Sequence, residues 1–124
     1  MERVSEQAGP SGEPIDPLDA LEAATAGRAI LVDVRRDDEW AAGHVAGAFH
    51  LPLDEIEGPT VPPISDDRVV VTVCGGGGRA ARAAEALRAR GVEARAMAGG
   101  QRAWVAAGLP LDAPGDAATP SDPT

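Results

Sequence analysis

The stretch RVVVTVCGGGGRAARAAEALRARG, residues 68–91, decides the fold class of this chain. Its first part, residues 68–73, is apolar and rich in β-branched side chains, which predicts a strand buried on both faces. After a cysteine and a run of glycines, four apolar positions recur at helical spacing: Ala80, Ala83, Ala84 and Leu87. The stretch therefore predicts a buried strand, a glycine loop and an amphipathic helix in direct succession.

Strands and helices are expected to alternate on both sides of this stretch. Strands are predicted at residues 29–34, 47–52, 68–73 and 92–97. Helices are predicted at residues 17–26, 37–42, 79–90 and 100–107. This alternation predicts an α/β fold with a mostly parallel central sheet and helices on both of its faces.

Two of these helices begin at residues typical of helix starts. Asp16 followed by Pro17 is the pattern of an N-cap with proline in the first turn, and Asp37 is expected to cap a brief helix through Trp40 that ends at Gly43. On the first helix, three residues are expected to share one face: Leu18, Leu21 and Thr25. On the helix after the glycines, the charged side chains are expected to form a solvated face in which the arginines pair with the glutamate: Arg82, Arg88, Arg90 and Glu85.

With 124 residues, the chain has room for one domain. The ends are rich in Gly, Pro, Ser and Asp, a composition that buries too little apolar surface to offset the entropy of ordering. We therefore expect a folded domain over residues 15–111 between disordered tails at 1–14 and 112–124. Aromatic residues are few, and Trp40 and Trp104 are expected to anchor helices on the sheet.

The charge and the cysteine count exclude several classes of function. A net charge of −9 argues against nucleic acid as a partner, because binding to the phosphate backbone needs clustered Lys and Arg. No segment has the apolar length of a signal or membrane-spanning helix, so we expect no membrane association and a cytoplasmic protein. One cysteine and two histidines offer neither a disulfide framework nor a convincing metal site, and we expect no metal and no cofactor.

The chemistry is expected in the cysteine loop, Cys74-Gly75-Gly76-Gly77-Gly78-Arg79. Sites in open α/β sheets form beyond the carboxyl ends of strands, where this loop begins. Glycines let the backbone curl so that N–H groups can point at the Cys74 sulfur and at an anion above it. The helix N-terminus and Arg79 both favour the nucleophilic thiolate over the thiol near neutral pH.

The loop sequence allows two other interpretations. Cys74 could be an inert buried residue beside a flexible joint, but four glycines cost folding entropy and are an odd choice for a mere connection. A phosphate-binding P-loop is the other alternative, and it lacks the Lys-Ser/Thr ending that such loops require.

The chain resembles the rhodanese homology family over nearly all of the part expected to fold. The matching segments are LVDVR at 31–35, Glu39, GHVAGA at 43–48, LP at 51–52, the cysteine loop and GGQRAW at 99–104. Their order and spacing are together highly specific. The resemblance implies a parallel sheet of about five strands with helices on both faces.

The resemblance also implies roles for individual residues. It makes Cys74 the catalytic residue that carries a persulfide, and it assigns donor binding to Gly75, Gly76, Gly77, Gly78 and Arg79. Structural support of the loop and the adjoining turn falls to Asp33, Arg35, Glu39 and His44. Two positions depart from the family pattern, because Ala80 stands where a serine is common and His50 where a small amide is common. His50 is interpreted mainly as a half-buried strand residue, and the all-glycine loop predicts slower catalysis.

The resemblance predicts a thiosulfate sulfurtransferase that moves sulfur from a thiosulfate-like anion to a thiol, to cyanide or to a protein acceptor. A non-enzymatic binding or regulatory module of the same fold is the alternative. Related phosphatases and arsenate reductases are less favoured, since they place five residues between the cysteine and the arginine, and four stand here. A reductase of that kind would also need a second thiol.

Overall fold

The computed structural model describes residues 12–59, 67–76 and 78–112 of the chain. Most of the two predicted disordered tails, residues 1–11 and 113–124, lies outside the described residues, so their disorder and the domain limits stay predictions. The elements in chain order are α2 (Pro17–Thr25), β1 (Ala29–Asp33), α3 (Asp37–Ala41), β2 (His44–Val45), β3 (Phe49–His50), α4 (Leu53–Glu57), β4 (Val69–Val73), α5 (Gly78–Arg88), β5 (Ala94–Ala96), α6 (Gly100–Ala106) and β6 (Leu111–Asp112).

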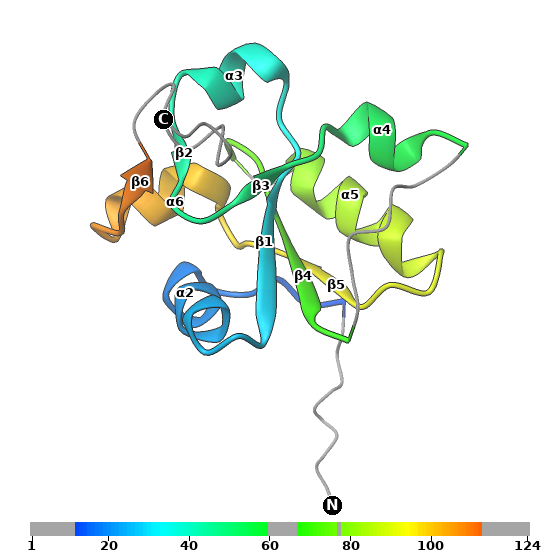
Figure 1. Cartoon of the computed structure of the whole chain (residues 1–124), viewed down its shortest axis with the longest axis horizontal. Coiled ribbons are helices and arrows are strands. Elements are labelled where there is room, and N and C mark those ends of the chain that lie inside the picture. The colour runs from blue at the N-terminus through cyan, green and yellow to red at the C-terminus, as the bar shows by residue number, and fades with distance from the viewer. Residues whose placement is uncertain (1–11, 60–66, 77, 113–124) are drawn as a thin grey trace, which may run out of the picture.

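The central sheet is parallel and has the strand order β3-β1-β4-β5 (Figure 1). Its centre is the pairing of β1 with β4, which runs in register from Ala29 opposite Val69 to Asp33 opposite Val73. All five residues of β1 are buried, which confirms the predicted strand covered on both faces. The carboxyl ends of β1 and β4 therefore lie side by side.

The sheet has four strands rather than the expected five. Ile15 makes a single parallel bridge to Met97, in which its N–H donates to the Ala96 carbonyl at 2.8 Å and its own carbonyl accepts from Ala98 at 2.8 Å. Asp16 and Pro17 then start a helix at once, so no further residue can pair. The fifth strand is thereby reduced to one residue.

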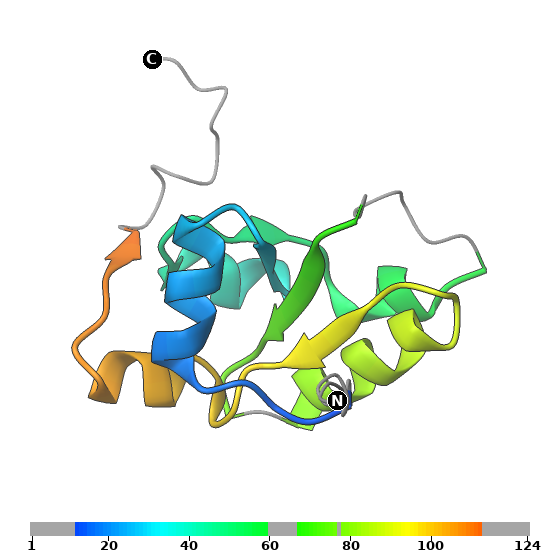
Figure 2. The same cartoon turned by 90° about the horizontal axis from the view of Figure 1, so that it is seen from below.

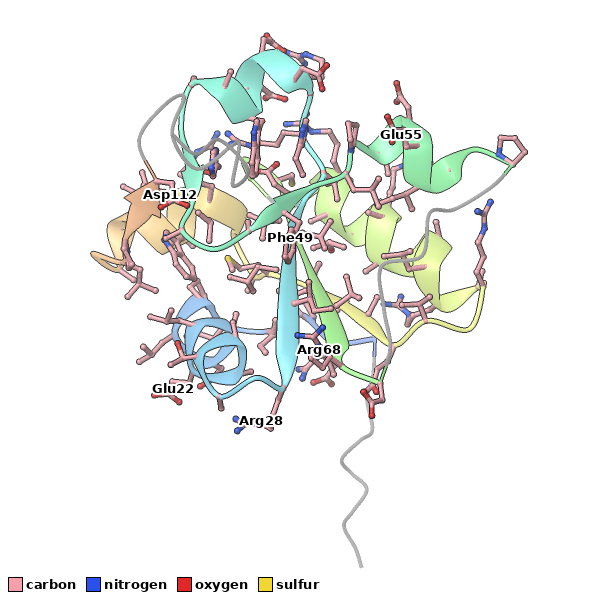
Figure 3. The ribbon with its side chains drawn as sticks, in the orientation of Figure 1. Glu22, Arg28, Phe49, Glu55, Arg68 and Asp112 are labelled. Atoms are coloured by element: carbon pink, nitrogen blue, oxygen red, sulfur yellow. The ribbon has the colours of Figure 1, made fainter. Side chains whose placement is uncertain are left out.

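A separate antiparallel ribbon closes the C-terminal end of the described chain. His44 pairs with Asp112 and Val45 with Leu111, which joins β2 to β6. The Asp112 carboxylate, labelled in Figure 3, also accepts from the Gly47 N–H at 3.2 Å. Asp112, expected at the start of the disordered tail, is thus described as part of a strand.

Helices cover both faces of the sheet, as expected (Figures 1 and 2). Successive side chains of a strand point to opposite faces of the sheet, so β1 and β4 contribute residues to two hydrophobic cores, one on each face. The core beneath α4 and α5 includes Val32, Val70, Ile56 and Leu87. The core beneath α2 and α6 includes Ala20, Leu31, Val71 and Trp104. Trp104 is fully buried in this second core, which confirms its interpretation as a packing anchor, whereas Trp40, 8% exposed, belongs to neither core and stacks with His44 and His50. None of the helices described combines the length and apolar composition that crossing a bilayer needs.

The first helix begins as predicted but packs through a different face. Asp16 accepts from the Leu18 N–H at 3.2 Å, which confirms the N-cap. Leu18 is 49% exposed, whereas Ala20 is fully buried. The expected face of Leu18, Leu21 and Thr25 is therefore wrong for Leu18 and Thr25, because the small alanines let the helix lie close to the sheet.

The start of α3 also differs from the prediction. Asp37 is the first helical residue and Arg36 occupies the cap position, where its N–H donates to the Glu39 carboxylate at 3.0 Å. An acidic side chain in the first turn satisfies this backbone group, so Asp37 is not needed as the cap. The strand expected over residues 47–52 is limited to the two residues of β3, because the turn at Gly47 and the proline at Pro52 bound it closely.

The long helix α5 buries the alanine and leucine face predicted for it: Ala80, Ala83, Ala84 and Leu87. Its arginines do not pair with Glu85. Arg82 binds the Glu57 carboxylate of α4 through Nη2 at 2.8 Å and Nε at 3.2 Å, while Arg88 donates to the Ala94 carbonyl at 3.0 Å. Long guanidinium side chains reach past their own helix, so they tie α5 to its neighbours.

Candidate functional site: the cysteine loop

The cysteine loop lies at the carboxyl edge of the parallel sheet. Cys74 directly follows β4, and α5 begins at Gly78, so the chain turns from strand to helix within a few residues. Gly77 lies outside the described residues, and Gly76 and Gly78 are exposed. The loop therefore occupies the place where open α/β sheets bind ligands.

The Cys74 side chain is held beneath the first turn of α5. Its sulfur accepts a hydrogen bond from the Ala80 N–H at 3.3 Å, and the residue is 1% exposed. The Thr72 hydroxyl donates to the Ala80 carbonyl at 2.7 Å, which fixes that turn against β4. A sulfur in this position lies against the amide end of the helix, where negative charge is stabilised.

The first turn of α6 packs directly on the loop backbone. The Gln101 N–H donates to the Cys74 carbonyl at 2.7 Å, and the Arg102 N–H donates to the Gly75 carbonyl at 3.1 Å. Gly100 has φ +62°, and a Cβ there would lie 2.8 Å from the Gly75 carbonyl oxygen. Only glycine permits this approach, because any side chain would push α6 off the loop.

Arg79 is held by Glu39 in a two-point ion pair. Its Nη1 lies 2.7 Å from Glu39 Oε1 and its Nη2 lies 3.1 Å from Oε2. The Arg79 guanidinium, by hydrogen bonding, lowers the pKa of the Glu39 carboxyl to about 2. The same bond raises the pKa of Arg79 above its usual value, with smaller contributions from the charges of Cys74 and Asp33. The pair therefore stays charged over the physiological range.

A buried ion pair braces the turn beside the loop. The Asp33 carboxylate accepts from the Arg35 side chain at 3.0 Å and from the Arg35 backbone N–H at 2.9 Å. Arg35 also donates to the Gly43 carbonyl at 2.8 Å. This network joins the end of β1 to the turn before β2, so the supporting positions expected at Asp33 and Arg35 are close to each other and to that turn.

His44 and His50 lie on either side of Trp40. The His44 ring stacks on Trp40 with centroids 3.4 Å apart, and the His50 ring does so at 4.8 Å. His44 is fully buried, and its Nδ1 lies 3.0 Å from the Trp40 carbonyl oxygen. His50 Nε2 lies 2.8 Å from the Arg35 carbonyl oxygen, which ties β3 to the turn after β1. Both histidines thus contact the scaffold around the site.

A cleft of about 630 Å³ opens on the α3 and α4 side of the cysteine loop. Its lining carries two guanidinium groups and four carboxylates: Arg36, Arg79, Asp37, Asp38, Asp54 and Glu55. The Glu55 side chain is visible on α4 in Figure 3. The lining of the cleft has a net negative formal charge, so the cleft does not attract a small anion.

Metal chemistry was not expected from the sequence. Among the residues that the structure describes, no group of three His, Cys, Asp or Glu side chains is placed to hold a metal ion. The expected absence of a metal or cofactor stays a prediction.

The family model of the Rhodanese-like domain matches residues 16–107 of the chain. The chain belongs to the rhodanese-like domain family. This match covers every described element from α2 to α6, so the resemblance seen in the motifs is confirmed at the level of the family and its fold.

Two curated relatives are similar to most of this chain. The HTH-type transcriptional regulator Rv0324 of Mycobacterium tuberculosis is 34% identical over 106 residues, 82% of this chain and 46% of the relative. The human thiosulfate:glutathione sulfurtransferase is 33% identical over 110 residues, 77% of this chain and 96% of the relative. The chain spans between 45% and 61% of the length of the first three curated relatives it matches.

A solved structure supports the same fold. The rhodanese-related protein of Thermoplasma volcanium superposes with a TM-score of 0.72 at 25% identity, covering 81% of this chain and 97% of its own. The two proteins therefore share the rhodanese-like fold over most of both chains.

The sequence did not reveal every residue that surrounds the loop of this rhodanese-like domain. Thr72, Gly100 and Arg102 all contact the loop or the helix that follows it. The paired glycines at the start of α6, Gly99 and Gly100, were a usable signal, because two glycines after a strand suggest a close backbone approach. Arg102 carried no such signal, since its position depends on how α6 crosses the sheet edge.

Proposed function

We propose that this rhodanese-like domain is a sulfurtransferase that carries a sulfane sulfur as a persulfide on Cys74. One observation carries the proposal: Cys74 directly follows β4 at the carboxyl edge of the sheet, and its sulfur accepts from the Ala80 N–H at 3.3 Å. This position stabilises a thiolate, which is the nucleophile that sulfur transfer needs.

In the first step the Cys74 thiolate attacks the outer sulfur of thiosulfate. A bond forms between Sγ and that sulfur, the sulfur–sulfur bond of the donor breaks, and sulfite leaves with the electron pair. Cys74 is left as a persulfide anion. The charge on donor, persulfide and leaving group is stabilised by the backbone N–H groups of the loop glycines and by Arg79, as in an oxyanion hole.

In the second step an acceptor removes the sulfur. A thiolate or cyanide attacks the terminal sulfur of the persulfide, and the Cys74 thiolate is released. Because the chain has one cysteine, no second thiol of its own can intercept the persulfide. The loaded form therefore waits for an external acceptor, and the name of the human relative supports a small thiol in that role.

The remaining site residues act by position. Glu39 holds Arg79 at the loop, while Asp33, Arg35 and His44 brace the turn next to it. Gly75, Gly76, Gly77 and Gly78 leave room for the donor because they carry no side chains. The low exposure of Cys74 favours small donors over proteins in the first step.

A second candidate is a regulatory module that binds a ligand without turnover. The observation that favours it is the relative from Mycobacterium tuberculosis, which is named as a transcriptional regulator and matches 82% of this chain. A regulatory module of that kind needs neither the Cys74 sulfur at the start of α5 nor Arg79 bound to Glu39, so we place this candidate second.

The test is steady-state formation of thiocyanate from thiosulfate and cyanide by the full chain. We expect parallel lines in double-reciprocal plots, the sign of a two-step transfer, and loss of activity in Cys74→Ser. Ala81→Ser is the matched control, because it places the same side chain on the exposed face of α5 and should leave the rate unchanged. Absence of turnover with every sulfane donor would favour the regulatory module.

A further inference from the structure

Arg102 approaches the cysteine loop at Gly75 and Gly76 and is not among the residues that line the acidic cleft, which includes Arg79. Its backbone N–H donates to the Gly75 carbonyl at 3.1 Å, so the first turn of α6 is fixed to the loop. Its guanidinium reaches back over the loop: Nη1 and Cζ lie 3.5 and 4.0 Å from the point where a Cβ of Gly76 would stand. The lack of a side chain at Gly76 leaves that space open.

The two guanidinium groups at the loop differ in their partners. Arg79 is neutralised by the two-point pair with Glu39. The Arg102 side chain is exposed, and within the described part of the chain it makes no ion pair and no hydrogen bond. Arg102 is therefore the guanidinium at the loop whose charge no carboxylate of the described residues offsets, whereas Arg79 acts with Glu39 bound to it.

The surrounding charge directs an anion to this side. The cleft beside Arg79 has four carboxylates against two guanidinium groups, which repels a dianion. Arg102 does not line that cleft, and Gly75 and Gly76, the loop residues that it approaches, carry no charge. A planar guanidinium matches the oxygens of an oxyanion with two parallel hydrogen bonds, which makes it suited to a sulfonate group.

We propose that Arg102 binds the oxyanion group of the sulfane donor and so selects doubly charged donors such as thiosulfate. The inference rests on the proposed function. Arg102 holds the sulfonate end while the Cys74 thiolate attacks the outer sulfur, the donor's sulfur–sulfur bond breaks, and sulfite leaves with the electron pair. Arg102 thus sets the affinity for the donor, whereas Cys74 performs the chemistry.

The first test compares KM and kcat for two donors. Thiosulfate is a dianion, while methanethiosulfonate carries a methyl group in place of one oxyanion. In Arg102→Gln we expect KM for thiosulfate to rise about tenfold, the loss of one charged hydrogen bond, with a smaller rise for methanethiosulfonate. We expect kcat to change by no more than about twofold, and Arg102→Lys to recover part of the affinity.

Arg28→Gln is the matched control. Arg28 precedes β1 at the end of the sheet away from the loop, it is exposed, and it makes no side-chain ion pair among the described residues (Figure 3). The variant removes the same charge from the molecule, so an equal rise in KM would show a general charge effect and overturn the proposal. An unchanged KM for thiosulfate in Arg102→Gln would also overturn the proposed role of Arg102, while the proposed sulfurtransferase function would stand.

A binding measurement separates the inference from the proposed function. Titration calorimetry with thiosulfate on Cys74→Ser, with and without Arg102→Gln, needs no turnover. Binding that is weakened about tenfold by Arg102→Gln supports the proposal even if the wild-type chain forms no persulfide, in which case the sulfurtransferase reading fails alone. Equal affinity of the two proteins contradicts the role of Arg102.

Discussion

At the scale of single residues, the site depends on charges held in pairs. Glu39 of α3 and Arg79 of α5 form two hydrogen bonds with each other. Asp33, the last residue of β1, pairs with Arg35 just after the strand. The two pairs differ in burial: the Asp33 side chain is fully buried, whereas the Arg79 side chain is 35% exposed. Each pair predicts a different consequence of substitution.

Arg79→Lys should reduce catalysis more than stability. Lysine cannot reproduce the two parallel hydrogen bonds to Glu39, so the charge at the loop loses its fixed position. We expect kcat/KM for thiosulfate to fall by about tenfold. Arg82→Lys is the matched control, because Arg82 makes a similar two-point pair with Glu57 on the exposed surface between α4 and α5. Equal losses in both variants would contradict a specific role for Arg79.

Asp33→Asn should destabilise the fold. The substitution leaves the Arg35 guanidinium buried without its carboxylate, which costs about 3 kcal/mol of unfolding free energy. Urea unfolding followed by circular dichroism measures it. Asp38→Asn is the control, because the Asp38 side chain is 73% accessible in its pair with Arg36 and the substitution should leave the unfolding free energy nearly unchanged. A comparable change of unfolding free energy in both variants would show that the effect of Asp33→Asn does not come from the burial of Asp33.

The sequence identified most of these residues but not their geometry. Cys74 and Arg79 were predictable because a buried strand, a glycine run and a helix follow one another around them. The pairing of Arg79 with Glu39 joins residues that are 40 positions apart, and nothing in their local spacing encodes it. Arg102 was missed for the same reason, since only the crossing of α6 over the loop places it there.

At the scale of elements, the position of α6 on the cysteine loop depends on Gly100. Gly100→Ala adds a Cβ into the backbone of Cys74 and Gly75 at a positive φ. We expect a loss of about 3 kcal/mol of unfolding free energy and a slower rate of persulfide formation, because α6 and the loop must separate. Thermal unfolding and a single-turnover reaction with thiosulfate measure the two effects.

Gly27→Ala isolates the cost of the backbone conformation. Gly27 also has a positive φ, but a Cβ there would meet nothing within 4 Å. This control should lose about 1 kcal/mol and keep the wild-type rate. If both variants lose the same stability and activity, the contact between α6 and the loop does not position the site.

Elements with strong periodicity were predicted well, and short ones were not. The four buried positions of α5 follow from one repeated spacing, and β1 and β4 follow from runs of β-branched residues. The ribbon of β2 and β6 was not predicted, because each strand has two residues and they pair from distant parts of the chain. The buried face of α2 was misjudged since leucine was favoured over alanine, whereas close packing on the sheet selects the smaller side chain.

At the scale of the whole molecule, the Glu39–Arg79 pair predicts how stability depends on pH. The folded pKa of Glu39, about 2, lies below its ordinary value of 4.5. Its contribution is therefore fully present above pH 4.5 and is lost as the pH falls through about 2. After allowance for solvent screening, we expect wild type to exceed Glu39→Gln by about 1 kcal/mol at pH 7 and the difference to shrink between pH 4.5 and 2.

Urea unfolding of both proteins from pH 7 to pH 3 measures this difference. Glu22→Gln is the control, because Glu22 is exposed on α2 and makes no ion pair within the described residues (Figure 3). Its difference from wild type should stay flat over the same range. A difference for Glu39→Gln that grew as the pH fell would contradict the pairing of Glu39 with Arg79.

The fold as a whole brings the Cys74 thiol and the guanidinium groups of Arg79 and Arg102 to the same edge of the sheet. The central claim is that the thiol carries sulfur, and intact mass of the full chain tests it most directly. The protein is measured before thiosulfate, after thiosulfate and after cyanide, with Cys74→Ser in parallel. We predict the gain of one sulfur atom that cyanide removes and that Cys74→Ser abolishes. No gain in mass with thiosulfate or with any other sulfane donor would contradict the claim.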